Sequence, residues 1–186
     1  METPTQIIPL ESLDAIRIVS NPKLEANSKS RLENFPHNQE GKFEIREVED
    51  PDMGKCLEIE LMPEGKVWEM TQEYVTLKLV NPIPTTAKSA GVWIKGNGSW
   101  GSVHIDKKQG WGPWATNSNR FFNWPSVGMM NFDGWNFIRY PYYDWVRKND
   151  NAIQGLTITV PRSAVVGTEM TPVENLKVRI KSIVLF

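Results

Sequence analysis

The sequence predicts an all-β protein, folded as an antiparallel β-sandwich, and three observations support this prediction. Apolar residues alternate with polar ones in several short runs, as in strands that bury one face. Turn-forming residues separate these runs at intervals typical of sandwiches. Helical spacing of apolar residues never holds for more than about two turns.

Each alternating run is expected to form a half-buried strand. Their apolar positions are, in chain order, Phe43 and Ile45; Leu57, Ile59 and Leu61; Val75, Leu77 and Leu79; Val103 and Ile105; Leu156, Ile158 and Val160. Between the runs, Asp50–Gly54 and Gly96–Gly98 are expected to form tight turns, because Asn, Asp and Gly adopt turn conformations readily.

Two aromatic strands are expected in the core. The run Gly91–Lys95 is apolar on both faces, which predicts a central strand covered from both sides, with Trp93 buried. Trp135 lies among the apolar neighbours of residues 134–138 and is also expected to be buried.

The final run, residues 176–186, predicts a strand with one irregularity. Leu176, Val178 and Ile180 share one face, but Ile183 and Leu185 are out of phase with them. A β-bulge near residues 181–182 would return both sets to the core.

Composition excludes several classes of protein. The net charge is −1, so the chain lacks the basic footprint of a nucleic-acid-binding protein. It has no apolar run long enough to span a membrane. The single cysteine, Cys56, has no partner for an internal disulfide and is interpreted as a small buried side chain.

The length of 186 residues fits one domain. We expect residues 1–12, which contain Pro4 and Pro9, to be a linker or a loose terminus, and residues 13–186 to be a single β-sandwich domain. Residues 1–5 lack the basic and apolar segments of a signal peptide. Both a protein that stays inside the cell and one whose signal peptide is missing from this sequence remain open.

No catalytic centre is recognised, and no cofactor is expected. The two histidines, His37 and His104, lack a cluster of ligands at metal-binding spacing. The acidic run of Glu44, Glu47, Glu49, Asp50 and Asp52 is interpreted as a solvated face rather than a glycosidase pair. A glycoside hydrolase, or a polysaccharide lyase with His104 as its base, stays open as the alternative.

The distribution of tryptophan is the unusual feature. Of eight tryptophans, only Trp68 lies outside the segment from Trp93 to Trp145. Residues 105–135 lose the alternation and are too aromatic to be an ordinary connection. Sugar rings stack on aromatic faces, and Asn, Arg and Asp bind their hydroxyl groups. The candidate carbohydrate-binding residues are Trp100, Trp111, Trp114 and Trp124, which we call the loop tryptophans, with Arg120 and Arg139.

Three stretches resemble jelly-roll carbohydrate-binding modules of the galactose-binding-like fold. Residues 92–99 (VWIKGNGS) are similar to the strand and turn of these modules, residues 132–138 (FDGWNFI) to a second strand, and residues 178–185 (VRIKSIVL) to their last strand. The resemblance covers about residues 13–186. It implies a jelly-roll domain that binds a polysaccharide or oligosaccharide, linked covalently to a catalytic domain and secreted, periplasmic or on the cell surface.

The chain departs from this family in residues that bear on a metal. Lys181 and Ser182 stand where the last strand often carries Asp, and Asn97 stands where the turn often does. Calcium prefers carboxylate ligands, so a structural calcium ion is doubted. A structural accessory domain, whose aromatic segment packs on a neighbouring domain, is a further alternative.

Overall fold

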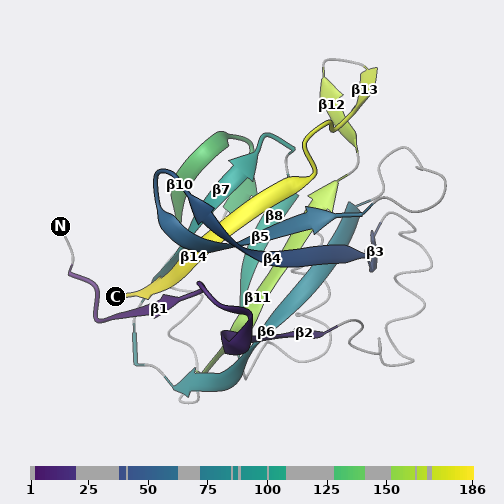
Figure 1. Ribbon diagram of the computed structural model, residues 1–186. Helices are drawn as coiled ribbons and strands as arrows, with labels where there is room; N and C mark the ends of the chain where they lie inside the picture. The colour runs from purple at the N-terminus through teal and green to yellow at the C-terminus, as the bar shows by residue number, and fades with distance from the viewer. Residues whose placement is uncertain are drawn as a thin grey trace, which may run out of the picture.

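The structure is a computed structural model, shown in Figure 1, and its strands cover most of the chain that it describes. It describes residues 3–19, 38–40, 42–62, 72–84, 86–87, 89–99, 101–107, 128–140, 152–161, 163–166 and 169–186. The described elements are β1 (Gln6–Pro9), η1 (Leu13–Ala15, a 3-10 turn), β2 (Ile16–Val19), β3 (Asn38–Glu40), β4 (Phe43–Asp50), β5 (Gly54–Leu61), β6 (Gln72–Pro84), β7 (Ala90–Asn97), β8 (Gly101–Lys107), β9 (Gly128–Met130), β10 (Asp133–Tyr140), β11 (Ala152–Pro161), β12 (Ser163–Val166), β13 (Glu169–Pro172) and β14 (Lys177–Leu185).

Two six-stranded sheets form the sandwich. Sheet A has the strand order β10-β7-β14-β5-β4, with β1 also paired to β14. Sheet B has the order β2-β6-β11-β8-β9, with β3 also paired to β6. All pairs are antiparallel except β3 with β6. The predicted all-β antiparallel sandwich is therefore confirmed, and β12 and β13 form a small separate hairpin that projects from it (Figure 1).

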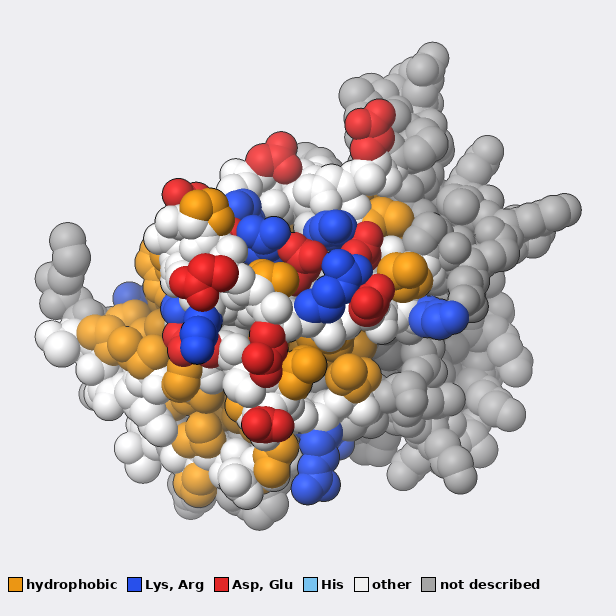
Figure 2. Space-filling view, in the orientation of Figure 1, with side chains coloured by type: hydrophobic (Ala, Val, Ile, Leu, Met, Phe, Trp, Pro, Cys, Tyr) orange, Lys and Arg blue, Asp and Glu red, His pale blue; other side chains and the backbone are white. Residues whose placement is uncertain are grey.

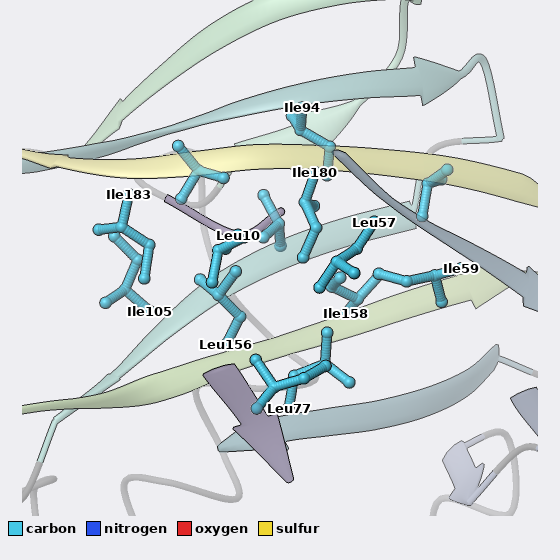
Figure 3. Close-up of a cluster of buried hydrophobic side chains, with 14 of the residues drawn as sticks. Leu10, Leu57, Ile59, Leu77, Ile94, Ile105, Leu156, Ile158, Ile180 and Ile183 are labelled. Carbon is cyan, nitrogen blue, oxygen red and sulfur yellow. The ribbon is translucent and has the colours of Figure 1, made fainter. Parts of the chain in front are cut away.

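The inner faces of the two sheets enclose an aliphatic core. The apolar residues of the alternating runs lie in this core or pack against it, and Leu57, Ile158 and Ile180 illustrate the contact between the sheets in Figure 3. Burying one such side chain stabilises the fold by about 1.5–3 kcal/mol. Among the side chains that the structure describes, the fully buried apolar ones are aliphatic, Met or Cys, and none is aromatic.

Strand β14 contains the predicted bulge. Its register against β7 shifts between Ile180 and Ser182. Val178 and Ile180 before the shift, and Ile183 and Leu185 after it, are all buried in the core. One extra residue in the strand therefore lets both halves present their apolar side chains to sheet B.

Both predicted turns are present. The β4–β5 hairpin turns between Asp50 and Gly54, which has a φ of 69°. After β7, Gly98 has a φ of 66°, and the side chain of Asn97 accepts a hydrogen bond from the Ser99 N–H at 3.3 Å. Positive φ is accessible to glycine without steric cost, which explains the residue at each turn.

The chain start is part of the sandwich, which corrects the prediction that residues 1–12 are a linker or a loose terminus. Strand β1 pairs with β14, and Ile8 and Leu10 are buried in the core. The Thr5 N–H donates to the Leu185 carbonyl at 2.8 Å. The two prolines at positions 4 and 9 led to the wrong boundary because proline is tolerated in an edge strand.

Candidate ligand-binding surface

The predicted carbohydrate-binding residues fall mostly outside the described part of the chain. The loop tryptophans and Arg120 are outside it: Trp100, Trp111, Trp114, Arg120 and Trp124. Arg139 is described, and it lies exposed on β10. His104, the base of the alternative lyase, is paired in register with Thr157 of β11, but its side chain is not among those described.

Trp93 and Trp135 are only half-buried, so the prediction that both are core residues is wrong. The inner face of β7 carries Val92 and Ile94, which are fully buried against sheet B. Trp93 alternates with them and therefore lies on the outer face of sheet A, as does Trp135 on β10. Among the residues that the structure describes, a cluster of rings covers part of the outer side of the run Gly91–Lys95, in agreement with its apolar character on both faces.

This outer-face aromatic cluster comprises Trp93, Phe137 and Phe186. Phe137 lies directly opposite Trp93 across the β10–β7 ladder, and their ring centroids are 5.3 Å apart at an interplanar angle of 46°. Phe186 meets Phe137 edge-on, with centroids 6.0 Å apart. Such separations are favourable for aromatic pairs. The cluster therefore brings β10, β7 and the end of β14 together on one face.

Arg139 lies at one side of the aromatic cluster, next to Phe186. Its guanidinium carbon lies 4.5 Å from the centroid of the Phe186 ring, a cation–π contact. Its Nη2 donates to the Ser89 Oγ at 2.8 Å. The predicted shared face of Trp135, Phe137 and Arg139 is confirmed by the register of β10 against β7.

A glycine beneath the cluster leaves room for the Phe137 ring. A Cβ atom at Gly91 would come within 2.3 Å of the Phe137 ring and 2.8 Å of the Ile138 carbonyl oxygen. The absence of a side chain at this position therefore creates the space that Phe137 occupies.

Next to the aromatic cluster, a buried carboxylate links several strands. Asp50 is 1% exposed and accepts hydrogen bonds from Trp135 Nε1 at 3.0 Å, Lys95 Nζ at 3.0 Å and Arg179 Nη1 at 2.7 Å. Arg179 also donates to Glu58 through Nε and Nη2. Figure 2 shows acidic and basic side chains interleaved over β14, β5 and β4, so the opposite charges on this face lie next to one another.

The Asp50 contacts require the β4–β5 hairpin to bend over the outer face of sheet A. Strands β4 and β10 lie at opposite edges of the sheet, four strand steps apart or roughly 19 Å if it were flat. The Asp50 carboxylate nevertheless contacts the Trp135 indole. In Figure 1 the turn between β4 and β5 lies beside β10 and β7, in agreement with this contact.

Three carboxylates of the β4–β5 hairpin have lowered pKa values. Burial alone would raise the pKa of Asp50, but hydrogen bonds from Asp52 N–H, Trp135, Arg179 and Lys95 outweigh it and hold the pKa well below its ordinary range. The hydrogen bond from Arg46 lowers the pKa of Glu44, and the hydrogen bond from the Leu13 N–H lowers that of Glu47. A glycosidase acid needs a raised pKa, and none of these three carboxyls has one.

The described residues contain no group of three or more His, Cys, Asp or Glu side chains that could hold a metal ion. Lys181, one of the residues that put a calcium site in doubt, donates from Nζ to the carboxylate of Glu11 and to the Lys55 carbonyl oxygen at 2.7 Å. An ammonium group thus engages oxygen acceptors at this end of the sheet.

We expect a metal chelator to leave the melting temperature unchanged to within about 1 °C, because no structural metal is expected. A metal that bound only the folded state would stabilise it, and its removal would lower the melting temperature. Thermal unfolding followed by circular dichroism, with and without excess EDTA, measures this. A fall of several degrees that added calcium reverses would show a structural calcium site and contradict the expectation.

A comparison with solved structures finds a likeness to this chain. No family model matches the chain, and no curated protein does. A solved structure described as a low affinity xylan binding module, CBM86, from the gut symbiont Roseburia intestinalis is similar to it, with a TM-score of 0.44 and 14% sequence identity, over 97% of this chain and 93% of that one. Separately, no helix in the described residues is long and apolar enough to cross a membrane.

Proposed function

We propose that this protein is a non-catalytic module that binds a polysaccharide. One observation carries the proposal: the described core is aliphatic, whereas Trp93, Trp135 and Phe137 lie half-buried on the outer face of a sheet. Rings that lie outside the core are available to a ligand, and exposed apolar groups with polar neighbours mark binding surfaces.

The finer features of the proposal come from the sequence. They are a jelly-roll, galactose-binding-like topology and a glycan surface that includes the loop tryptophans, Arg120 and Arg139. They also include a covalently linked catalytic domain and a secreted, periplasmic or cell-surface location. No cofactor is assigned to the module.

The direct test is binding of the purified protein to a panel of soluble polysaccharides. The panel comprises xylan, mixed-linkage β-glucan, mannan and polygalacturonate, with retardation in affinity electrophoresis as the readout. We expect retardation by at least one of them and no release of reducing ends or unsaturated sugars. Retardation by none would overturn the proposal, and release of sugar products would favour the glycoside hydrolase or polysaccharide lyase.

Replacing one loop tryptophan by alanine, in Trp111→Ala or Trp114→Ala, is expected to weaken binding about tenfold, since loss of one stacked ring removes on the order of 1–3 kcal/mol by analogy with base stacking. Titration calorimetry with the best polysaccharide of the panel measures the change. Trp68→Ala, outside the tryptophan-rich segment, is the matched control. If both loop variants bind like the wild-type protein, the loop tryptophans do not form the site.

A further inference from the structure

The aromatic cluster on the outer face of sheet A has no role in the core. Trp93 and Phe137 lie on the side of β7 and β10 that faces away from sheet B, and Phe186 follows the end of β14. Each ring is half-buried and so keeps part of its surface in water. Aromatic surface left in water lowers solubility without stabilising the fold, which makes a contiguous group of rings a candidate contact surface.

The surroundings of the cluster differ at its two ends. At the end near Trp135, the β4–β5 turn bends over the face, and Asp50 binds Trp135, Lys95 and Arg179. At the other end, Arg139 is exposed on β10, and Gly91 beside it has no side chain. The accessible part of this face is therefore the aromatic cluster, with Arg139 at its border.

An added β-strand fits this surface poorly. Strand β10 is the edge of sheet A in the described structure. The Phe137 N–H, in the middle of this strand, donates to the Oδ1 of Asn136 at 2.8 Å. Edge strands are often protected in such ways against pairing with another chain. A partner that binds across the face of the rings is a better match than one that extends the sheet.

The aromatic cluster and Arg139 offer the kinds of contact that a sugar ring makes. One face of a pyranose carries C–H groups that stack on an aromatic ring, and its hydroxyl groups accept hydrogen bonds from donors beside that ring. Trp93 and Phe137 supply the ring faces, and Arg139, an exposed residue that already donates to Ser89, carries five N–H groups in its guanidinium. The cation–π contact with Phe186 orients this guanidinium alongside the cluster.

We propose that the outer face of β7 and β10 is a second glycan-binding surface, which stacks one pyranose unit of the polysaccharide on Trp93 and Phe137 and binds its hydroxyl groups through Arg139. This inference rests on the proposed function, because it assumes that the protein binds a polysaccharide. It adds a surface made of described sheet residues, none of which is a loop tryptophan. The two surfaces together would bind a chain more tightly than either alone.

The test uses substitutions that keep the sheet intact. Phe137→Leu removes the ring but remains apolar above Gly91, and Arg139→Gln removes the charge but remains polar. Matched controls on the other sheet are Arg17→Gln and Ile18→Ala, whose side chains are exposed on β2. Affinity for each panel polysaccharide is measured by calorimetry, and the melting temperature of each variant is measured in parallel.

We expect Phe137→Leu and Arg139→Gln each to weaken binding by about threefold to tenfold, while both controls bind like the wild-type protein. As a readout independent of folding, the indole N–H signal of Trp93, assigned from its loss in Trp93→Phe, should shift when the polysaccharide is added to wild-type protein.

The possible failures are distinguishable. If the wild-type protein binds no polysaccharide of the panel, the proposed function and this surface are both overturned. If it binds, but the Trp93 signal does not shift and both sheet variants bind normally, only the second surface is overturned. A Trp93 signal that moves with protein concentration and not with sugar would assign the face to self-association instead.

Discussion

Replacing Asp50 by alanine is expected to lower the free energy of unfolding by about 3 kcal/mol. The variant removes the acceptor of Trp135, Lys95 and Arg179 at once. Breaking a buried ion pair by removing one partner costs on the order of 3–5 kcal/mol. The lower end applies here because the Lys95 and Arg179 side chains stay 31% and 27% exposed, so water can solvate them after the change.

Chemical denaturation at neutral pH measures this effect, and Asp52→Ala is the matched control because Asp52 is an exposed residue of the same turn. The control should change the free energy of unfolding by less than about 0.5 kcal/mol. Equal stability of the Asp50→Ala and Asp52→Ala variants would show that the carboxylate at position 50 does not hold the hairpin over the sheet.

The contribution of Asp50 should also depend on pH with a defined sign. Its pKa in the folded protein is held below the ordinary value of about 3.9 for an unfolded chain. The stabilisation is therefore fully present above that value and is lost as the pH falls towards the folded-state pKa. The difference in stability between wild type and Asp50→Ala should be constant from about pH 5 to pH 8 and shrink below about pH 4.

Replacing Gly155 by alanine is expected to destabilise the protein by about 4 kcal/mol or to prevent folding. Gly155 lies in β11 where the register against both β6 and β8 shifts, and its φ is 154°. A Cβ atom there would lie 1.9 Å from the Leu77 carbonyl oxygen. A backbone oxygen in a central strand cannot move aside, so the added methyl group would separate β11 from β6.

Gly134→Ala provides the control for this substitution. Gly134 also has a positive φ, of 89°, but nothing lies within 4 Å of its hypothetical Cβ atom. The strained backbone alone should cost about 1–3 kcal/mol there. Denaturant midpoints of the two variants separate the clash from the strain. A Gly155→Ala protein as stable as Gly134→Ala would contradict the close approach of β11 to β6.

The sequence predicted the inner faces of the sheets well, because alternation reports which side chains avoid water. Leu57, Ile158 and the out-of-phase residues Ile183 and Leu185 are all buried as expected. Alternation does not specify which strands become neighbours. The pairing of β14 with β7, β5 and β1 depends on the path of the whole chain, and β1 was missed because its four residues contain a proline.

The candidate surface was harder to predict for a physical reason. An apolar residue at Trp93 indicates that water is excluded on that side, but not whether a second layer or neighbouring rings exclude it. In the structure, the Phe137 ring packs beside Trp93 on that side. Asp50 was correctly placed at a turn, but its interpretation as part of a solvated face was wrong, because it is 1% exposed. Its partners follow from the bending of the hairpin over the sheet, which no local pattern reports.

The position of β14 in sheet A has a consequence for synthesis of the protein. This strand lies between β7 and β5 and also pairs with β1, yet it follows every other described strand in the sequence. A ribosome releases it after all its neighbours. Until then, sheet A exists as a β7–β10 ladder, a β4–β5 hairpin and an unpaired β1. Sheet A therefore cannot be completed before residues 177–185 have been synthesised, and pairings between such distant segments, as of Ile8 with Ile183, favour slow folding.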